Sequence, residues 1–136
     1  AELSGANTEN WCVQWFAIAS TEAKNASDNV PVDDAPVYVL SQADLRLADD
    51  AADLWDGTLE SSITTTQFGQ SQSGSVWTGT TFMGTPFPSA AMGATNPRVG
   101  NLGAGGFGLW VSSGSAPSNT ALPLYAVSEV LTVPAE

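Results

Sequence analysis

The sequence predicts one compact, loop-rich α+β domain with short antiparallel strands and little helix, and a nearly all-β domain is the alternative. Three observations lead to this class. A chain of 136 residues has the length of one ordinary domain, and 43% hydrophobic residues suffice for one core. Its 13 glycines and 8 prolines interrupt regular structure often. Its apolar residues also occur in short runs rich in β-branched and aromatic side chains, which favour strands.

The opening of the chain predicts one strand and one short helix. Residues 11–19 form a short, aromatic-rich apolar run, which suits a buried strand or the start of a helix. Residues 21–26 are expected to form one or two helical turns, with Thr21 as the N-cap. Because proline fixes φ and lacks an N–H, Pro31 and Pro36 exclude a regular element between them.

Five further segments are expected to form strands. Residues 37–40 and 45–48 have strand composition and predict a hairpin that is closed by the four residues between them. Later strands are expected at 75–80, 106–111 and 124–133, the last with apolar residues at alternate positions.

Composition excludes several classes of function. With Lys+Arg 3 against Asp+Glu 14 and a net charge of -11, the chain lacks the cations that bind nucleic acid or an anionic membrane surface. It has no histidine, which rules out a Ser-His-Asp triad, a histidine-zinc site and a Cys-His nucleophile. Residues 100–106 are glycine-rich, but no lysine follows as in a phosphate loop, so a flexible loop or a close backbone contact is expected. The protein is therefore expected not to be an enzyme, and a glycosidase-like carboxylate pair is the residual alternative.

Other compositional features favour export. Only 12% of the residues are charged, against roughly 25% in ordinary domains, and serine and threonine are abundant. The start Ala1-Glu2-Leu3 suits removal of a secretory signal, although removal of a starting Met would leave the same end. The longest apolar run, residues 11–19, is too short to span a bilayer, so no membrane insertion is expected. The expected location is secreted or cell-surface.

A series of short motifs is spaced along most of the chain. They are Trp15-Phe16-Ala17-Ile18-Ala19-Ser20, Val37-Tyr38-Val39-Leu40, Ala52-Asp53-Leu54-Trp55-Asp56-Gly57-Thr58-Leu59, Val76-Trp77-Thr78-Gly79-Thr80 and Leu124-Tyr125-Ala126. In this order they resemble exported bacterial proteins that are similar to the endostatin domain of collagens XV and XVIII, a compact relative of the C-type-lectin fold. The resemblance covers residues 15–127 and implies an endostatin-like, C-type-lectin-like fold with Trp77 in its core.

The resemblance also implies how the chain is organised. Residues 1–136 are expected to form a single domain, with an N-terminal segment at 1–14, an endostatin-like core at 15–127 and a C-terminal tail at 128–136. The end at Pro134-Ala135-Glu136 resembles the point where some of these exported proteins continue into a short exosortase sorting tail, so removal of such a tail is expected.

The chain departs from the family at its cysteines. The start is too short for the family's N-terminal helix, Ala126 replaces a strand cysteine, and residues 88–93 replace a cysteine-rich loop. The lone Cys12 is expected to be a small buried hydrophobe, with an intermolecular disulfide as the alternative. Small loop-rich domains usually need disulfides or contacts with other subunits for stability. Either the Trp and Phe residues therefore fill the core, or another copy of the chain covers the surface that the missing helix would have covered.

The aspartates are all concentrated between residues 28 and 56. Within this region Asp49, Asp50, Asp53 and Asp56 are candidate Ca²⁺ ligands, because Ca²⁺ prefers several carboxylate oxygens. The favoured interpretation is structural, without a metal or another cofactor. Residues 51–55 predict a single helical turn with Asp49 or Asp50 as its N-cap and a tight Asp-Gly turn at its end.

The second half of the chain is almost uncharged. No charged residue occurs between Glu60 and Arg98, and the Gly- and Pro-rich part of this stretch carries large apolar side chains. Because such a loop is unfavourable in water, we expect it to contact a partner or another copy of the chain. The candidate contact residues are Phe82, Met83, Phe87, Met92 and Trp110.

These observations predict a non-enzymatic exported structural or adhesive protein. The expected role is a self-associating subunit of an extracellular or surface assembly such as a fibre, sheath, shell or matrix, with copies of itself as partners. The alternative is a lectin-like module that binds a neutral carbohydrate or a protein ligand through residues 79–110.

Overall fold

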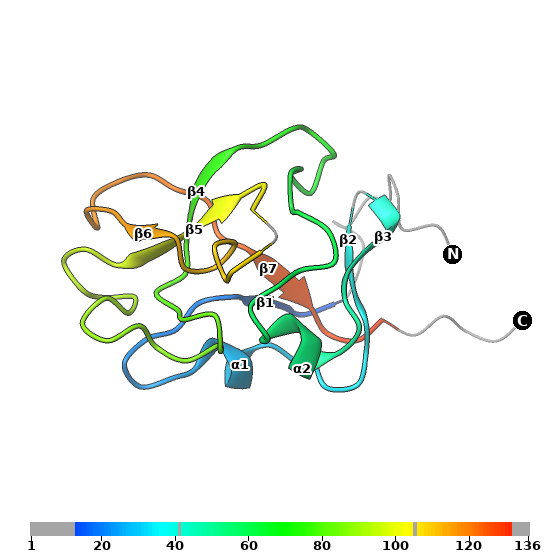
Figure 1. The fold of residues 1–136 in the computed structure, drawn as a ribbon, viewed down its shortest axis with the longest axis horizontal. Coiled ribbons are helices and arrows are strands. Elements are labelled where there is room, and N and C mark those ends of the chain that lie inside the picture. The colour runs from blue at the N-terminus through cyan, green and yellow to red at the C-terminus, as the bar shows by residue number, and fades with distance from the viewer. Residues whose placement is uncertain (1–12, 41, 105, 132–136) are drawn as a thin grey trace, which may run out of the picture.

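The computed structural model describes residues 13–40, 42–104 and 106–131, which fold into short strands and two single-turn helices (Figure 1). In chain order the elements are β1 (Trp15–Ala17), α1 (Ala26–Asn29), β2 (Val37–Val39), β3 (Gln42–Ala48), α2 (Ala51–Leu54), β4 (Gly74–Trp77), β5 (Arg98–Leu102), β6 (Gly114–Ser115) and β7 (Ala126–Ser128). The expectation of short antiparallel strands with little helix is confirmed. Within the described ranges, no helix has the length and apolar character needed to cross a bilayer.

Three small antiparallel sheets make up the framework. They pair β1 with β7, β2 with β3, and β4 with β5 and β6. Figure 1 shows the β4–β6 sheet at one end of the molecule and the β2–β3 hairpin at the other, with β1 and β7 between them. The central pair joins the first and last described strands, with Phe16 opposite Val127. Among the described residues no sheet has more than three strands, and long segments without regular structure connect the strands.

The β2–β3 hairpin and the helical turn after it follow the sequence prediction. In β2 the side chain of Tyr38 is exposed and that of Val39 is buried, as the alternation of a half-buried strand requires. β3 begins at Gln42, so the connection is shorter than the expected four residues. Asp50 is the N-cap of α2, and its side chain accepts a 3.0 Å hydrogen bond from the backbone N–H of Asp53.

The helix expected at residues 21–26 is wrong, and the short helix α1 begins at Ala26 instead. Thr21 and Lys24 exchange backbone hydrogen bonds of 3.0 and 3.3 Å, which close a tight turn. The buried Ser20 hydroxyl accepts a 2.8 Å hydrogen bond from the Ala26 N–H. This tertiary contact satisfies the first donor of the helix and so decides where the helix begins.

The strand expected at 106–111 is also wrong, because this segment forms tight turns. The N–H groups of Val111 and Ser112 donate back to the Gly108 carbonyl, at 3.2 and 2.8 Å. The neighbouring strand β5 was missed by the sequence analysis. Within it, Gly100 lies opposite Val76 of β4.

Gly100 explains how the turns at 106–111 pack on β5. A Cβ on this residue would collide with the backbone carbonyl of Trp110, so glycine permits the close approach. The expected close backbone contact is thus confirmed at this residue. The strands expected at 75–80 and 124–133 are present but shorter, as β4 and β7, and residues 132 and 133 lie outside the described ranges.

The core is built around aromatic side chains. Trp110 is 1% exposed, and its ring centroid lies 5.8 Å from that of Trp55 and 5.7 Å from that of Tyr125. The Tyr125 hydroxyl donates a 2.8 Å hydrogen bond to the Trp110 carbonyl. Trp77 is buried as well, as the family resemblance implies.

Buried hydroxyl groups link the central segments behind this core. Thr80 Oγ1 lies 2.9 Å from Ser20 Oγ, and Thr78 Oγ1 donates to the Val111 carbonyl. All three hydroxyl residues are fully buried. Because each hydroxyl has a partner, burial carries little desolvation penalty and the polar network joins segments far apart in sequence.

Candidate functional sites

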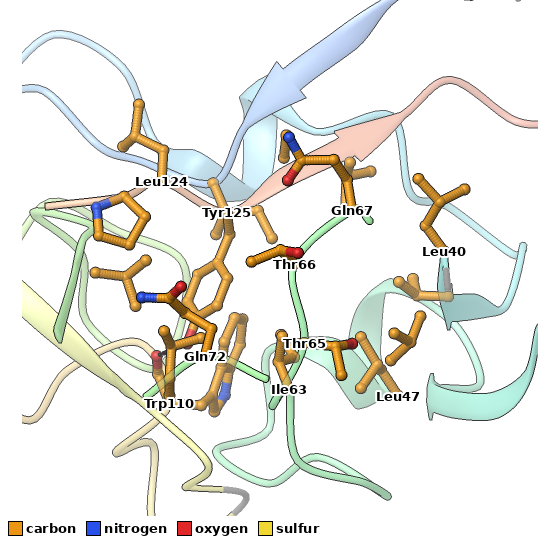
Figure 2. A pocket seen from close by; sticks show the side chains of 18 of the residues that line it. Leu40, Leu47, Ile63, Thr65, Thr66, Gln67, Gln72, Trp110, Leu124 and Tyr125 are labelled. Carbon is orange, nitrogen blue, oxygen red and sulfur yellow. Dashed lines mark hydrogen bonds between the residues drawn. The ribbon is translucent and has the colours of Figure 1, made fainter. Parts of the chain in front are cut away.

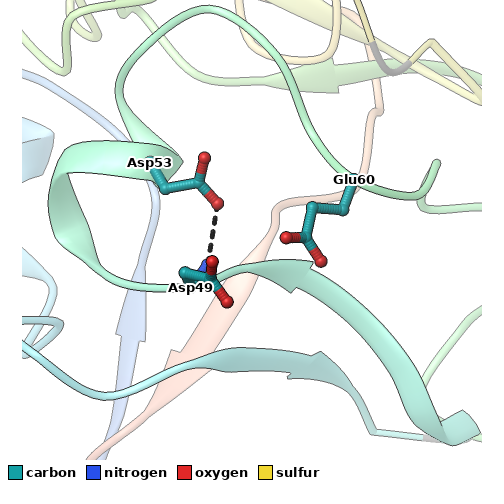
Figure 3. A group of neighbouring side chains, drawn as sticks. All are labelled: Asp49, Asp53 and Glu60. Atoms are coloured by element: carbon teal, nitrogen blue, oxygen red, sulfur yellow. Dashed lines mark hydrogen bonds between the residues drawn. The ribbon is translucent and has the colours of Figure 1, made fainter.

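Three carboxylates meet where β3 ends and α2 begins (Figure 3). The ligand atoms of Asp49, Asp53 and Glu60 all lie within 4.8 Å of one another. The structure thus brings together two of the four predicted Ca²⁺ candidates and adds Glu60. The sequence analysis missed Glu60 because it joins the group through a long-range contact, a 2.9 Å hydrogen bond from its N–H to the Leu47 carbonyl.

The other two candidates have local structural roles. Asp50 caps α2, as described above. Asp56 Oδ1 accepts hydrogen bonds from the backbone N–H and the hydroxyl of Thr58, at 2.8 and 2.9 Å. These contacts are the capping and turn interactions that the structural interpretation of the aspartates predicted.

Arg46 and a backbone amide are the partners of the carboxylate cluster. Arg46 Nη1 lies 2.7 Å from Asp49 Oδ1, and its Nε lies 2.7 Å from Glu60 Oε2. The hydrogen bond to Glu60, with the charge of Asp49, raises the pKa of the Arg46 guanidinium. Asp53 accepts a 2.7 Å hydrogen bond from the Asp49 N–H. These are the partners of the three carboxylates within the described residues, and the interpretation without a metal stays a prediction.

Exposed apolar side chains gather beside residues 106–111. We define the phenylalanine patch as the exposed residues Phe82, Met83, Phe107 and Leu109. Phe82 packs against two glycines. A Cβ added to Gly57 would lie 3.3 Å from the Phe82 ring, and a Cβ added to Gly108 would lie 2.5 Å from the Phe82 Cβ. Phe82 is thereby held next to the segment that carries Phe107 and Leu109.

Phe107 is the most exposed member of the patch. Its side chain is 94% exposed, and its backbone has a φ of 56°, in the left-handed region that bulky side chains rarely adopt. A phenylalanine that is both strained and solvated is unfavourable for the isolated chain. Such outliers are concentrated at functional positions.

The remaining predicted contact residues pack within the chain. Half-buried Phe87 stacks under the Arg98 guanidinium, whose carbon lies 4.3 Å from the ring centroid. Half-buried Met92 packs over Gly79. Trp110 is a core residue, so its assignment to a contact surface is wrong. Cys12 lies outside the described residues.

A pocket of about 480 Å³ opens between the β2–β3 hairpin, residues 63–72 and the segment leading into β7 (Figure 2). Figure 2 shows Tyr125 and Trp110 on one side of it and Leu40 and Leu47 on the other, with Thr66 between them. Burial raises the pKa of the Tyr125 hydroxyl above its ordinary value, so this wall stays neutral at physiological pH. The sequence analysis missed this pocket because its lining comes from segments far apart in the chain.

Comparisons with known proteins add no identification. No protein-family model matches this chain, and neither the curated proteins nor the solved structures give a significant match. The endostatin-like and C-type-lectin-like fold therefore stays a prediction that depends on the sequence motifs. The structure itself shows a small, sheet-rich domain with antiparallel strands.

Proposed function

We propose that this protein is a non-enzymatic, self-associating subunit of an extracellular or surface assembly, and that copies meet through the phenylalanine patch. The observation that carries the proposal is the cluster of exposed apolar side chains around the strained, solvated Phe107. Burying one phenylalanine side chain contributes about 1.5–3 kcal/mol, so covering the patch supplies a substantial driving force for association.

The charge distribution supports the same role. The four patch residues are uncharged, and they come from a part of the chain in which Arg98 is the single charged residue between Glu60 and Glu129. A net charge of -11 on each copy opposes other, less specific contacts.

The composition of the patch favours a protein surface over a sugar. The lectin-like alternative uses residues 79–110, which include all four patch residues, and their two phenylalanine rings offer faces for stacking. Sugar recognition also needs polar groups that bind hydroxyls, and the patch itself supplies no polar side chain. We therefore place the carbohydrate-binding role second.

The test is the assembly state of the purified chain, measured by sedimentation equilibrium over a range of concentrations. We expect concentration-dependent association, and Phe107→Ser is expected to raise the dissociation constant at least about tenfold, which corresponds to about 1.4 kcal/mol. Phe68→Ser is the matched control, because Phe68 is 78% exposed but lies in the separate loop closed by Thr65 and Ser71.

The outcomes separate the two roles. A chain that stays monomeric at every concentration contradicts the structural role, as does equal weakening by Phe107→Ser and Phe68→Ser. A monomer that binds neutral glycans on an array, and loses that binding in Phe107→Ser, supports the lectin-like role instead.

A further inference from the structure

The pocket described above reaches the hydrophobic core. Its floor is formed by side chains that belong to the buried cluster, among them Leu47, Leu54, Val76, Leu102 and Trp110. Its volume of about 480 Å³ falls within the roughly 300–1,000 Å³ of pockets that hold small ligands. Water in such a pocket contacts apolar side chains that the rest of the fold keeps dry, so an apolar ligand body would gain by replacing it.

Hydroxyl and amide side chains occur among the apolar side chains that line the pocket. Thr66, Gln67 and Gln72 line it from the segment that closes back on itself through the Thr66–Gln70 and Gln72–Thr64 backbone hydrogen bonds, both 2.8 Å. Thr66 Oγ1 accepts from two backbone N–H groups of this loop, which orient the segment. The side-chain amide of Gln67 makes no hydrogen bond within the described part of the chain, and Figure 2 shows it among the residues that line the pocket.

The charge of the lining decides the class of ligand. Among the described residues, those that line the pocket include no Asp, Glu, Lys or Arg. An anion would find no cationic partner there and would be repelled by a net charge of -11, and a cation would find no carboxylate. The lining therefore matches a neutral molecule.

We propose that this pocket is a binding site for a small neutral amphiphile, whose apolar body contacts the aliphatic and aromatic lining and whose polar end binds the glutamine and threonine side chains. Its single-ligand size and depth distinguish it from the phenylalanine patch, which is an exposed surface formed by other residues. The site is thus independent of the self-association proposed above.

The first experiment titrates the full chain with N-phenyl-1-naphthylamine, a neutral fluorescent probe with an apolar body and one N–H donor. We expect saturable binding of one probe per chain, with partial quenching of tryptophan emission because Trp15 and Trp110 line the pocket. Octanol is expected to displace the probe at least about tenfold more effectively than octanoate at neutral pH, because the anion lacks a partner.

Substitutions then locate the probe. Ala126→Phe is expected to fill the mouth of the pocket and abolish binding, and Leu124→Gln is expected to weaken it at least about fivefold. Val130→Gln is the matched control for Leu124→Gln, because Leu124 and Val130 are 53% and 55% exposed and only Leu124 lines the pocket. Circular dichroism and thermal melting confirm that each variant is folded.

Phe107→Ser separates the pocket from the phenylalanine patch. Probe binding that survives Phe107→Ser and Val130→Gln but is lost in folded Ala126→Phe supports the proposal. If probe binding is lost in Phe107→Ser but retained in Ala126→Phe, the probe binds the phenylalanine patch and the pocket proposal is overturned. Absence of saturable binding also overturns it.

Discussion

At the scale of single residues, Gly100 decides how closely two distant segments pack. The position that its Cβ would take is occupied by the backbone carbonyl of Trp110, which cannot move aside as a flexible side chain can. The same contact places Trp110 against Tyr125 in the core. The lack of a Cβ at Gly100 therefore permits the turns at 106–111 to pack closely on β5.

Substitution of Gly100 tests this contact. We expect Gly100→Ala to lower the free energy of unfolding by about 3 kcal/mol, since overpacking against backbone forces a shift of β5 or of the turns. Gly106→Ala is the control, because a Cβ there meets nothing within 4 Å and the change is expected to stay within about 0.5 kcal/mol. Urea unfolding measures both, and equal losses would contradict this account.

Tyr125 predicts how stability depends on alkaline pH. Burial raises the pKa of its hydroxyl above the ordinary value of 10.0, so the unfolded chain releases this proton at a lower pH than the folded chain does. Its contribution to stability is fully present below pH 10.0 and is lost as the pH rises further, by at most about 1.4 kcal/mol per pH unit.

The corresponding variants are Tyr125→Phe and Tyr38→Phe. Tyr125→Phe is expected to reduce stability at neutral pH by about 1 kcal/mol, because it removes the hydrogen bond to the Trp110 carbonyl, and to flatten the alkaline decline. Tyr38→Phe retains Tyr125 and is expected to retain the decline. Thermal melts recorded between neutral pH and pH 11 check this, and an unchanged decline in Tyr125→Phe would refute it.

At the scale of elements, the junction between β3 and α2 shows how acidic residues are used structurally. Asp50 caps α2, and Arg46 from β3 contacts Asp49 and Glu60. The cation thus reduces the repulsion among three neighbouring carboxylates. The junction keeps α2 against the hairpin that forms one wall of the pocket.

Removal of the Arg46 guanidinium is expected to allow Asp49, Asp53 and Glu60 to bind Ca²⁺. We expect the native chain to give no calorimetric heat and no change in melting temperature with Ca²⁺, because Arg46 is paired with two of the three carboxylates and Asp53 accepts a backbone hydrogen bond. Arg46→Met is expected to melt at a lower temperature, and added Ca²⁺ is expected to restore part of the loss. Tight Ca²⁺ binding by the native chain would contradict the structural interpretation.

At the scale of the whole molecule, net charge and the phenylalanine patch act against each other. Each copy carries a net charge of -11, so two copies repel at long range, while the uncharged patch favours contact at short range. Salt shortens the range of the repulsion and leaves the burial of apolar area almost unchanged.

Self-association is therefore expected to strengthen with salt. The dissociation constant should fall when ionic strength is raised from about 0.01 M to about 0.15 M, because the screening length shrinks from about 30 Å to about 8 Å. Light scattering at fixed protein concentration measures this. Weaker association at the higher ionic strength would show that ion pairs, and not the patch, hold the copies together.

The parts of the fold that were predictable from sequence depend on near neighbours. The β2–β3 hairpin and the capped turn α2 were predicted because strand composition and an aspartate N-cap act within a few residues. The start of α1 was missed because it depends on the hydrogen bond from the Ala26 N–H to the Ser20 hydroxyl. The strand β5 was missed because it depends on the close packing of Gly100 against the Trp110 backbone.

The candidate sites divide in the same way. Composition pointed to the neutral half of the chain, and Phe82 and Met83 are exposed there, but whether they contact a partner stays a prediction. Phe107 and Leu109 were missed and Trp110 was wrongly assigned to the surface, because a strand was expected at 106–111, where tight turns occur. In those turns Leu109 is exposed while the next residue, Trp110, is buried, and the packing of the turns on β5 decides which of them is covered.

The sequence by itself determined the negative charge, the absence of histidine chemistry, and the preference for short antiparallel strands, since each depends on residue type or on neighbours in the chain. Only the tertiary structure decided which aromatic side chains are buried, which three carboxylates come together where β3 ends, and where the pocket lies. These features arise where distant segments meet, and such contacts are governed by the packing of backbone and side chains in three dimensions.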